Sequence, residues 1–429
     1  MPLRAQIPQS FLSIDGRNPD DEDDEAIEKP LTGPQLIERL RKTARGSIPM
    51  WILLKPLFKS NFTQAQRGSD LVKRMVSTKT GGAEAIFATN IFDEEHGLMQ
   101  PLGAPTLLFL PWRSTALALQ GAEFIGSFSM LGGSENYAFA RDDEVVLFIW
   151  NDEPVAENIY LGEKSKVIVM DIWGRQKGLP FDEQTKLHII EAGPVPQIIR
   201  RCNEAVTRWR LASQLEKGNI PSATGRHSNA IVGLNTFSQG VSVEAKLNMP
   251  PEWEADPTSW EIPLGKGEQF SLPMVLTIPA NTSLGSDVLS IDFIIDAAEQ
   301  HNFRVYRPVK VGLGDVFVQV FDRKLEDGRL EIEQVIVNRT NPEKVLNFFC
   351  NLFVPGYRRQ KKFVIKLGNG KNQKKYYIPN AEKLRGKELW LRAEQIEERR
   401  VLNKRWIVGQ KWDEQDKEQK AARLKQPSP

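Results

Sequence analysis

The chain has 429 residues, and its 57 Lys and Arg nearly balance its 55 Asp and Glu, which leaves a formal net charge of +2. One compact core does not grow to this length, so we expect roughly two to four domains. Because neither sign of charge dominates, the composition gives no reason to expect nucleic acid or an anionic membrane as a partner.

The sequence shows no signal for membrane insertion or export. No apolar run comes near the roughly 20 residues that span a bilayer, so we expect no membrane span. The first residues contain the acidic run DDEDDE where a secretory leader would be basic and then apolar, so no export signal is expected in this chain. The compartment therefore stays unknown. If the N-terminus is truncated, the protein would be exported or displayed at the cell surface.

Neither the cysteines nor the histidines follow a metal-binding pattern. Cys202 and Cys350 fall in different predicted domains, which argues against a disulfide framework or a cysteine metal site. The four histidines are scattered, without an HxH or HExxH spacing. Since no phosphate-binding GxxxxGKS/T and no GxSxG nucleophile elbow occur either, we assign no metal and no cofactor.

Residues 1–125 alternate between strand and helix patterns. Apolar runs predict strands, and apolar residues at helical spacing predict helices, in the order strand Leu3–Ile14, helix Gln35–Arg45, strand Met50–Leu57, helix Thr63–Thr80, strand Ala83–Ala88, helix Thr106–Phe124. An acidic loop, residues 15–29, interrupts the first unit. The alternation implies parallel βα units, and three such units cannot close a (β/α) barrel, because a complete one needs about 250 residues. The open edge of their sheet would favour self-association.

The remainder of the chain is mostly predicted as strands. Short strands with turn signals over residues 126–200 indicate a small antiparallel β domain. Residues 201–227 are assigned as helix and linker, with one amphipathic helix over Gln197–Glu216. Two immunoglobulin-like β-sandwiches follow, residues 228–312 and 313–408, and then a charged tail, residues 409–429. The expected fold class is thus multi-domain α/β plus all-β.

The loop that follows the strand Ala83–Ala88 is a candidate functional site. Active sites of βα barrels form where strands end, and this loop places four polar side chains there, Asn90, Asp93, Glu94 and Glu95. Glycoside hydrolysis needs one carboxyl that protonates the leaving oxygen and a second that attacks or activates water. The alternative interpretation is a charged surface loop. We treat the four residues as candidates for substrate binding and assign no catalytic residue.

Trp253 and Trp260 are a second candidate. They lie in the proline-rich segment PPEWEADPTSWEIPLGKGE, and aromatic faces stack on sugar rings as well as pack in cores. Sugar stacking and core packing are therefore both open for these two residues.

The order of several short motifs resembles a glycoside-hydrolase-like family. GAEAIF, followed by DEEHGLMQPLGAP, is similar to the last strand and helix of a bacterial βα barrel with trailing β domains, and VVLFIWNDEP with DIWGR is similar to the small β domain behind it. Residues 241–296 resemble the immunoglobulin-like module associated with alpha-galactosidases. The resemblance implies that residues 1–125 are a partial (β/α) barrel, the closing part of a complete one. The matches cover roughly residues 30 to 300 and include no catalytic signature.

The resemblance implies a non-catalytic or degenerate C-terminal portion of such a protein, with a carbohydrate-associated or scaffolding role. Carbohydrate is then the expected ligand. Two alternatives stay open: an active glycosidase whose barrel a partner subunit completes, and an interaction protein that binds no sugar. If the chain is active, the resemblance implies glycoside hydrolysis.

Overall fold

Strands dominate the computed structural model, which describes residues 3–6, 50–142, 144–222, 225–312, 315–396, 400–410 and 412. Its content is 51% strand and 12% helix, and the described residues form many small antiparallel sheets and no barrel of the α/β type. The expected fold class, a partial (β/α) barrel joined to all-β domains, is therefore wrong. The predicted helix Gln35–Arg45, the acidic loop and most of the charged tail lie outside the described residues.

A three-stranded parallel sheet is what the described residues contain in place of the predicted barrel. Its strands lie in the order β1 (Leu3–Gln6), β2 (Met50–Leu54), β3 (Ala85–Ala88). Two helices accompany it, α2 (Gln64–Thr80) and α3 (Phe109–Leu119). Their apolar residues share one core with both this sheet and a neighbouring antiparallel sheet. The helices therefore lie between two sheets and do not form the outer ring that a barrel requires.

That antiparallel sheet organises the N-terminal half. Its order is β4 (Glu123–Gly126), β5 (Glu135–Arg141), β6 (Glu144–Trp150), β12 (Gln197–Asn203), β8 (Ile168–Asp171), β9 (Gln176–Gly178). A smaller sheet has the order β10 (Phe181–Asp182), β11 (Leu187–Ala192), β7 (Val155–Ile159). Separate apolar clusters cover the two faces of the large sheet. This explains why six of the seven residues of β6 are buried.

The segment predicted as one helix over Gln197–Glu216 is a strand followed by a short helix, so that prediction is wrong. Strand β12 ends at Asn203, and α4 (Glu204–Ala212) begins there. A register shift between Ile199 and Cys202 places these two side chains in the same apolar cluster, while Ile198 lies in the cluster on the opposite face. The bulge thus produces an apolar spacing that resembles helical periodicity.

The helix predicted over Thr106–Phe124 is also too long. Helix α3 ends at Leu119, and the chain turns at Gly121, where φ is 68°. Phe124 lies on β4 and packs against the core that α3 also contacts. Because α3 and β4 pack against the same core, the apolar spacing of the sequence continues beyond the end of the helix.

The C-terminal half contains two β-sandwiches. The sheets of the first are β13 (Gln214–Leu215), β15 (Gly225–Leu234), β19 (Gln269–Ile278), β17 (Glu254–Asp256), and β14 (Asn219–Ile220), β21 (Gln300–Val311), β20 (Gly285–Asp296), β16 (Val241–Asn248), β18 (Ser259–Leu264). Those of the second are β22 (Val316–Lys324), β23 (Leu330–Asn338), β26 (Gly370–Ile378), and β25 (Gln360–Leu367), β24 (Leu346–Phe353), β27 (Glu388–Gln395), β28 (Val401–Ile407). A one-turn helix, α5 (Ala381–Leu384), follows β26. The β-sandwich character predicted for residues 228–408 agrees with this arrangement.

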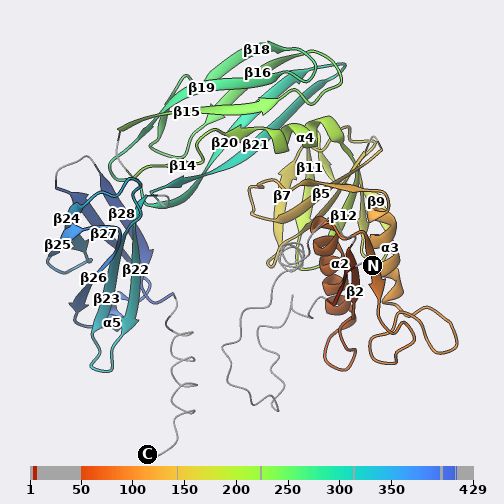
Figure 1. Cartoon of the computed structure of the whole chain (residues 1–429), viewed down its shortest axis with the longest axis horizontal. Coiled ribbons are helices and arrows are strands. Elements are labelled where there is room, and N and C mark those ends of the chain that lie inside the picture. Colours follow the sequence, from red (N-terminus) through yellow and green to blue (C-terminus); the bar gives the residue numbers. More distant parts are fainter. Residues whose placement is uncertain are drawn as a thin grey trace, which may run out of the picture.

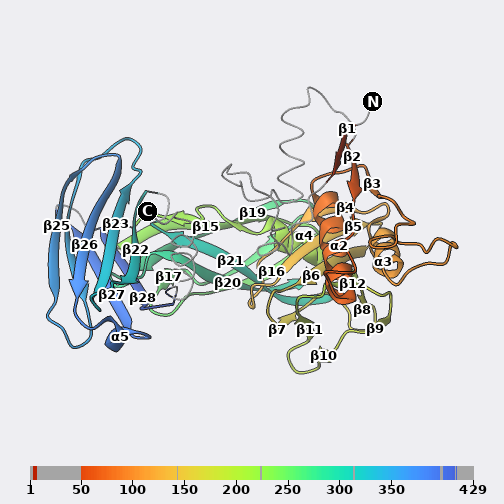
Figure 2. The same cartoon turned by 90° about the horizontal axis from the view of Figure 1, so that it is seen from below.

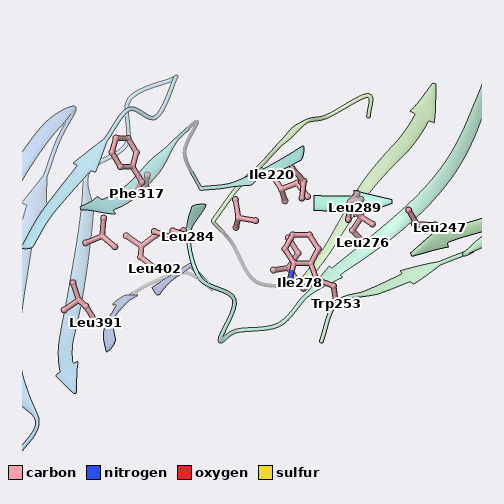
Figure 3. Packing of buried hydrophobic residues seen from close by; sticks show 14 of the residues in the cluster. Ile220, Leu247, Trp253, Leu276, Ile278, Leu284, Leu289, Phe317, Leu391 and Leu402 are labelled. Carbon is pink, nitrogen blue, oxygen red and sulfur yellow. The ribbon is translucent and has the colours of Figure 1, made fainter. Parts of the chain in front are cut away.

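The two sandwiches meet at a buried joint. Their apolar side chains form one cluster, and Figure 3 shows Leu284 of the first sandwich near Phe317 and Leu402 of the second. Asn403 is 0% exposed, and its amide donates to the carbonyl oxygens of Ala280 (2.7 Å) and Thr282 (3.1 Å). Apolar and polar contacts together fix this joint.

The parts of the chain form an arch. In Figure 1 the N-terminal half is one leg, the second sandwich is the other, and the first sandwich joins them. Figure 2 shows the same order from below, with the first sandwich in the middle. Among the described helices, none is long and apolar enough to cross a membrane.

Candidate functional site

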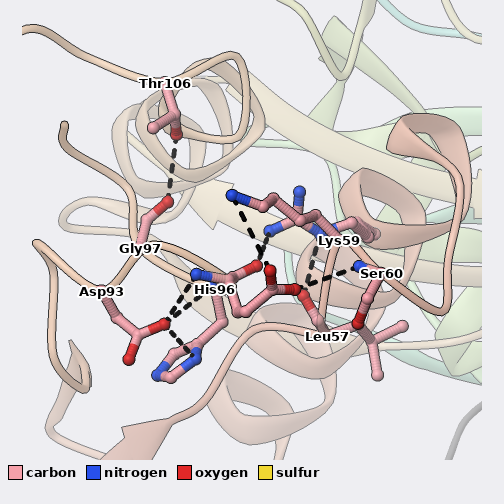
Figure 4. A network of polar contacts seen from close by, with 9 residues as sticks. Leu57, Lys59, Ser60, Asp93, His96, Gly97 and Thr106 are labelled. Carbon is pink, nitrogen blue, oxygen red and sulfur yellow. Dashed lines mark hydrogen bonds and ion pairs between the residues drawn. The ribbon is translucent and has the colours of Figure 1, made fainter.

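The acidic loop after β3 is held by its own carboxylates. Asp93 Oδ1 accepts hydrogen bonds from the backbone N–H groups of Glu95 (2.8 Å) and His96 (3.1 Å), and it lies 2.8 Å from Nδ1 of His96 (Figure 4). The hydrogen bond from the Glu95 backbone is the main reason why the pKa of Asp93 lies below its usual range. The ionised carboxylate of Asp93 therefore stabilises the turn of this loop.

Glu95 ties the same loop to the segment between β2 and α2. Its Oε2 accepts from the backbone N–H of Ser60 (3.1 Å), and its Oε1 lies 3.8 Å from Lys59 Nζ. Arg67 donates to the carbonyl oxygens of Leu57 (2.8 Å) and Glu95 (3.0 Å). The remaining two candidates, Asn90 and Glu94, are exposed, and Asn90 has a φ of 45°. The structure therefore brings the four residues into one loop and uses two of them to fix it.

The two candidate tryptophans lie elsewhere, in the first sandwich. Trp253 is 7% exposed and belongs to the apolar core. Trp260 is aligned with Ala245 on the neighbouring strand and packs against that core, half-buried. Core packing thus accounts for Trp253, whereas Trp260 also borders a cleft.

This cleft, called the interdomain cleft below, lies between the small β domain and the first sandwich. Its volume is about 820 Å³. The sandwich contributes residues of β16, β18, β20 and β21, and the small β domain contributes residues around β7 together with the loop at Ser129–Leu131. Ser129 pairs with Tyr306 across the gap. Ligand pockets commonly have this size and occur between domains.

The sandwich wall of the cleft is polar because the alternation of its strands turns charged side chains outward. Lys246, Asp292 and Arg304 lie side by side on β16, β20 and β21. Glu244 lies one outward position along β16, directly opposite Glu261 of β18. The wall therefore offers hydrogen-bond donors and acceptors within one strand spacing of each other.

The ion pair in this wall is well defined. Arg304 binds both carboxylate oxygens of Asp292, at 2.5 and 2.8 Å, and Asn248 adds a hydrogen bond of 2.9 Å. Burial acts to raise the pKa of Asp292, but the hydrogen bonds from Arg304 and Asn248 outweigh it and hold the pKa below its usual range. Asp292 is thus an ionised acceptor and a poor proton donor.

The opposite wall carries Glu157 and Tyr160. Glu157 is 2% exposed and accepts from the backbone N–H groups of Gly132 (2.9 Å) and Ser134 (3.1 Å). The Tyr160 hydroxyl lies 3.0 Å from His301 Nδ1, and its ring stacks on Phe303. Burial raises the pKa of Tyr160 to about 12, so its hydroxyl stays protonated. The polar groups of Glu157 and Tyr160 thus have hydrogen-bond partners. Tyr160 also links this wall to the first sandwich through His301 and Phe303.

Sequence reasoning missed this cleft except for Trp260. Strand alternation in VSVEAKLN predicts that its charged side chains point away from the core. Their partners across the gap lie far away in the sequence and carry no motif. Among the described residues no group of three or more His, Cys, Asp or Glu side chains could hold a metal ion.

Comparison with known proteins gives no family. No family model and no curated protein matches the chain. Solved structures with weak similarity include a C. elegans MSP family member (11% identity, 23% of this chain and 97% of that one, TM-score 0.18) and a red sea bream transglutaminase (9%, 67% and 41%, TM-score 0.25). The CupB2 chaperone of Pseudomonas aeruginosa is similar at 12% identity (45% and 97%, TM-score 0.16). These TM-scores are too low to carry an argument about fold or function.

Proposed function

We propose that this chain is a non-catalytic carbohydrate-binding protein whose ligand occupies the interdomain cleft. The observation that carries the proposal is the polar sandwich wall of a cleft of about 820 Å³. Each sugar hydroxyl both donates and accepts hydrogen bonds, so a ring needs both kinds of partner at close spacing. Glu244 and Lys246 supply an acceptor and a donor from outward positions of one strand.

The hydrogen bonds of two carboxylates in the cleft, Asp292 and Glu157, support binding over hydrolysis. A glycosidase needs one carboxyl that can deliver a proton to the leaving oxygen. Asp292 is held ionised by Arg304, and the Glu157 carboxylate accepts two backbone N–H groups. Both groups are arranged as acceptors. The role also agrees with the carbohydrate association implied by the resemblance to glycoside-hydrolase-like proteins.

A binding assay with a matched control tests the proposal. We would titrate the full chain with neutral gluco-, galacto- and manno-oligosaccharides in a calorimeter. The double variant Glu244→Gln/Glu261→Gln should weaken binding about tenfold, since each side chain loses its charge and one of its two acceptor oxygens. Tenfold corresponds to about 1.4 kcal/mol. Glu254→Gln is the control, because Glu254 is exposed on β17 of the opposite sheet.

Three results would contradict the proposal. No binding by any oligosaccharide would remove carbohydrate as the ligand class, and unchanged affinity in the double variant would place the site elsewhere. Release of reducing ends from the same ligands, lost in the double variant, would show an enzyme.

A further inference from the structure

Arg210 of α4 lies at the base of the interdomain cleft. It lines the cleft and is 2% exposed. Its Nη2 donates to the carbonyl oxygen of Tyr160 at 2.5 Å, and its guanidinium lies 5.0 Å from the ring centroid of Phe303 and 5.8 Å from that of Phe128. The group is thus packed between two aromatic rings at the junction of the small β domain and the first sandwich.

The remaining donors of Arg210 lack acceptors. Its Nε and Nη1 are buried without a hydrogen-bond partner, and none of the ion pairs of the described chain includes Arg210. Burial lowers the pKa of Arg210 to about 9, so the side chain still carries its charge at neutral pH. A buried cation with unpaired donors costs several kcal/mol unless a partner satisfies it.

The neighbouring residues do not supply the missing anion. Arg307 is also buried, and it donates only to carbonyl oxygens, those of Ser213, Arg210 and Tyr306. Glu157 lines the same cleft, but its two oxygens accept from Gly132 and Ser134. The junction therefore concentrates two positive charges without a paired carboxylate among the described residues.

We infer that the interdomain cleft takes an acidic glycan, whose carboxylate or sulfate group pairs with the guanidinium of Arg210. The inference rests on the proposed function and specifies its ligand. Carboxylate and sulfate oxygens form strong charge-assisted hydrogen bonds with arginine. The unpartnered Nε and Nη1 of Arg210 lie on different edges of the guanidinium, with the bonded Nη2 between them, so each can donate a single hydrogen bond to the acidic group. The hydroxyl groups of the same ligand bind the polar wall around Glu244 and Asp292.

The test compares matched ligands on the full chain by calorimetry. The probes are a neutral oligosaccharide, its uronate counterpart and its sulfated counterpart, each of the same length. We expect at least one acidic ligand to bind about tenfold more tightly than the neutral one, and the two acidic probes distinguish carboxylate from sulfate. Arg210→Gln should lower the affinity of the acidic ligand to that of the neutral one.

Arg208→Gln is the matched control, since Arg208 lies on the same helix and pairs with Glu204 at 2.6 Å. This change should preserve the preference for the acidic ligand. Equal affinities for neutral and acidic ligands in the unmodified chain would overturn the inference while leaving the proposed function intact. An acidic preference that persists in Arg210→Gln would overturn the assignment to Arg210.

A measurement on the unmodified chain keeps the inference testable if Arg210→Gln does not fold. Thermal unfolding is followed with free glucuronate, glucose and sodium chloride at matched ionic strength. Glucuronate alone should raise the unfolding temperature in a saturable manner, because it binds the folded state. An equal effect of all three solutes would contradict the inference. Stabilisation by glucuronate without binding of any oligosaccharide would retain the anion site and reject the proposed function.

Discussion

Single buried asparagines close equivalent corners of the two sandwiches. Asn235 donates to the carbonyl oxygen of Gly265 and accepts from the backbone N–H of Phe237. Asn338 makes the same pair of contacts with Gly368 and Thr340, again across 30 residues of sequence. The segments LNTF with PLGKG and VNRT with KLGNG contain this repeat. The repeat is therefore present in the sequence. The sequence alone does not show that each asparagine contacts the glycine turn 30 residues further along the chain.

Buried histidines respond to pH in a predictable direction. His188 is 0% exposed, and its Nδ1 accepts from the backbone N–H of Leu161 (3.3 Å), which requires the neutral ring. Burial lowers its pKa to about 4, whereas an unfolded chain has a value near 6.5. Between these values the unfolded state binds a proton that the folded state does not. The contribution of neutral His188 to the free energy of unfolding is therefore fully present above about pH 6.5. It decreases as the pH falls toward 4.

We predict that the free energy of unfolding of the small β domain decreases by about 2 kcal/mol between pH 7.5 and 4.5 because of His188. Urea unfolding of the full chain at both pH values measures the change. His188→Gln should have a smaller pH dependence than the unmodified chain. Burial also lowers the pKa of His96 and His301, so part of the dependence should persist. Identical pH dependence in the variant would contradict the prediction.

At the scale of elements, alternation predicted strands well where one face is buried. Val241–Asn248 alternates between buried and exposed residues almost without exception, and β20 and β21 follow the same rule. The prediction failed at β12, where a bulge imitates a helical period, and at the N-terminal sheet. There, strand and helix types were predicted correctly for β2 and α2, but the packing partner was not. Sequence periodicity shows that a face is buried without showing which element covers it.

The strand-to-helix change at Asn203 depends on a side-chain cap. The Asn203 side chain accepts from the backbone N–H of Val206 (3.0 Å), which satisfies one of the free donors at the start of α4. We predict that Asn203→Ala lowers the free energy of unfolding by about 1 kcal/mol, measured by urea unfolding. Asn203→Asp keeps an acceptor and should lose much less. An equal loss in both variants would show that the cap does not stabilise this junction.

At the scale of the whole molecule, the interdomain cleft brings together the small β domain and the first sandwich. The interdomain cleft joins residues near 130 and 160 to residues near 245 and 300. No pattern in the sequence links these segments, because their meeting depends on α4 and on contacts such as Tyr160 with His301. The sequence predicted the β-sandwiches. Its two candidate sites were the loop of Asp93, whose carboxylate fixes a turn, and the pair Trp253 and Trp260, of which only Trp260 lines the cleft.

A crystal structure of the full chain with a bound oligosaccharide tests the central claim most directly. We predict sugar density in the interdomain cleft, in contact with Glu244 and Asn302 on the sandwich wall and with Asn158 on the opposite wall. The stacked rings of Phe353 and Trp390 on the second sandwich are a competing surface. Sugar bound there, with an empty cleft at saturating ligand, would contradict the account.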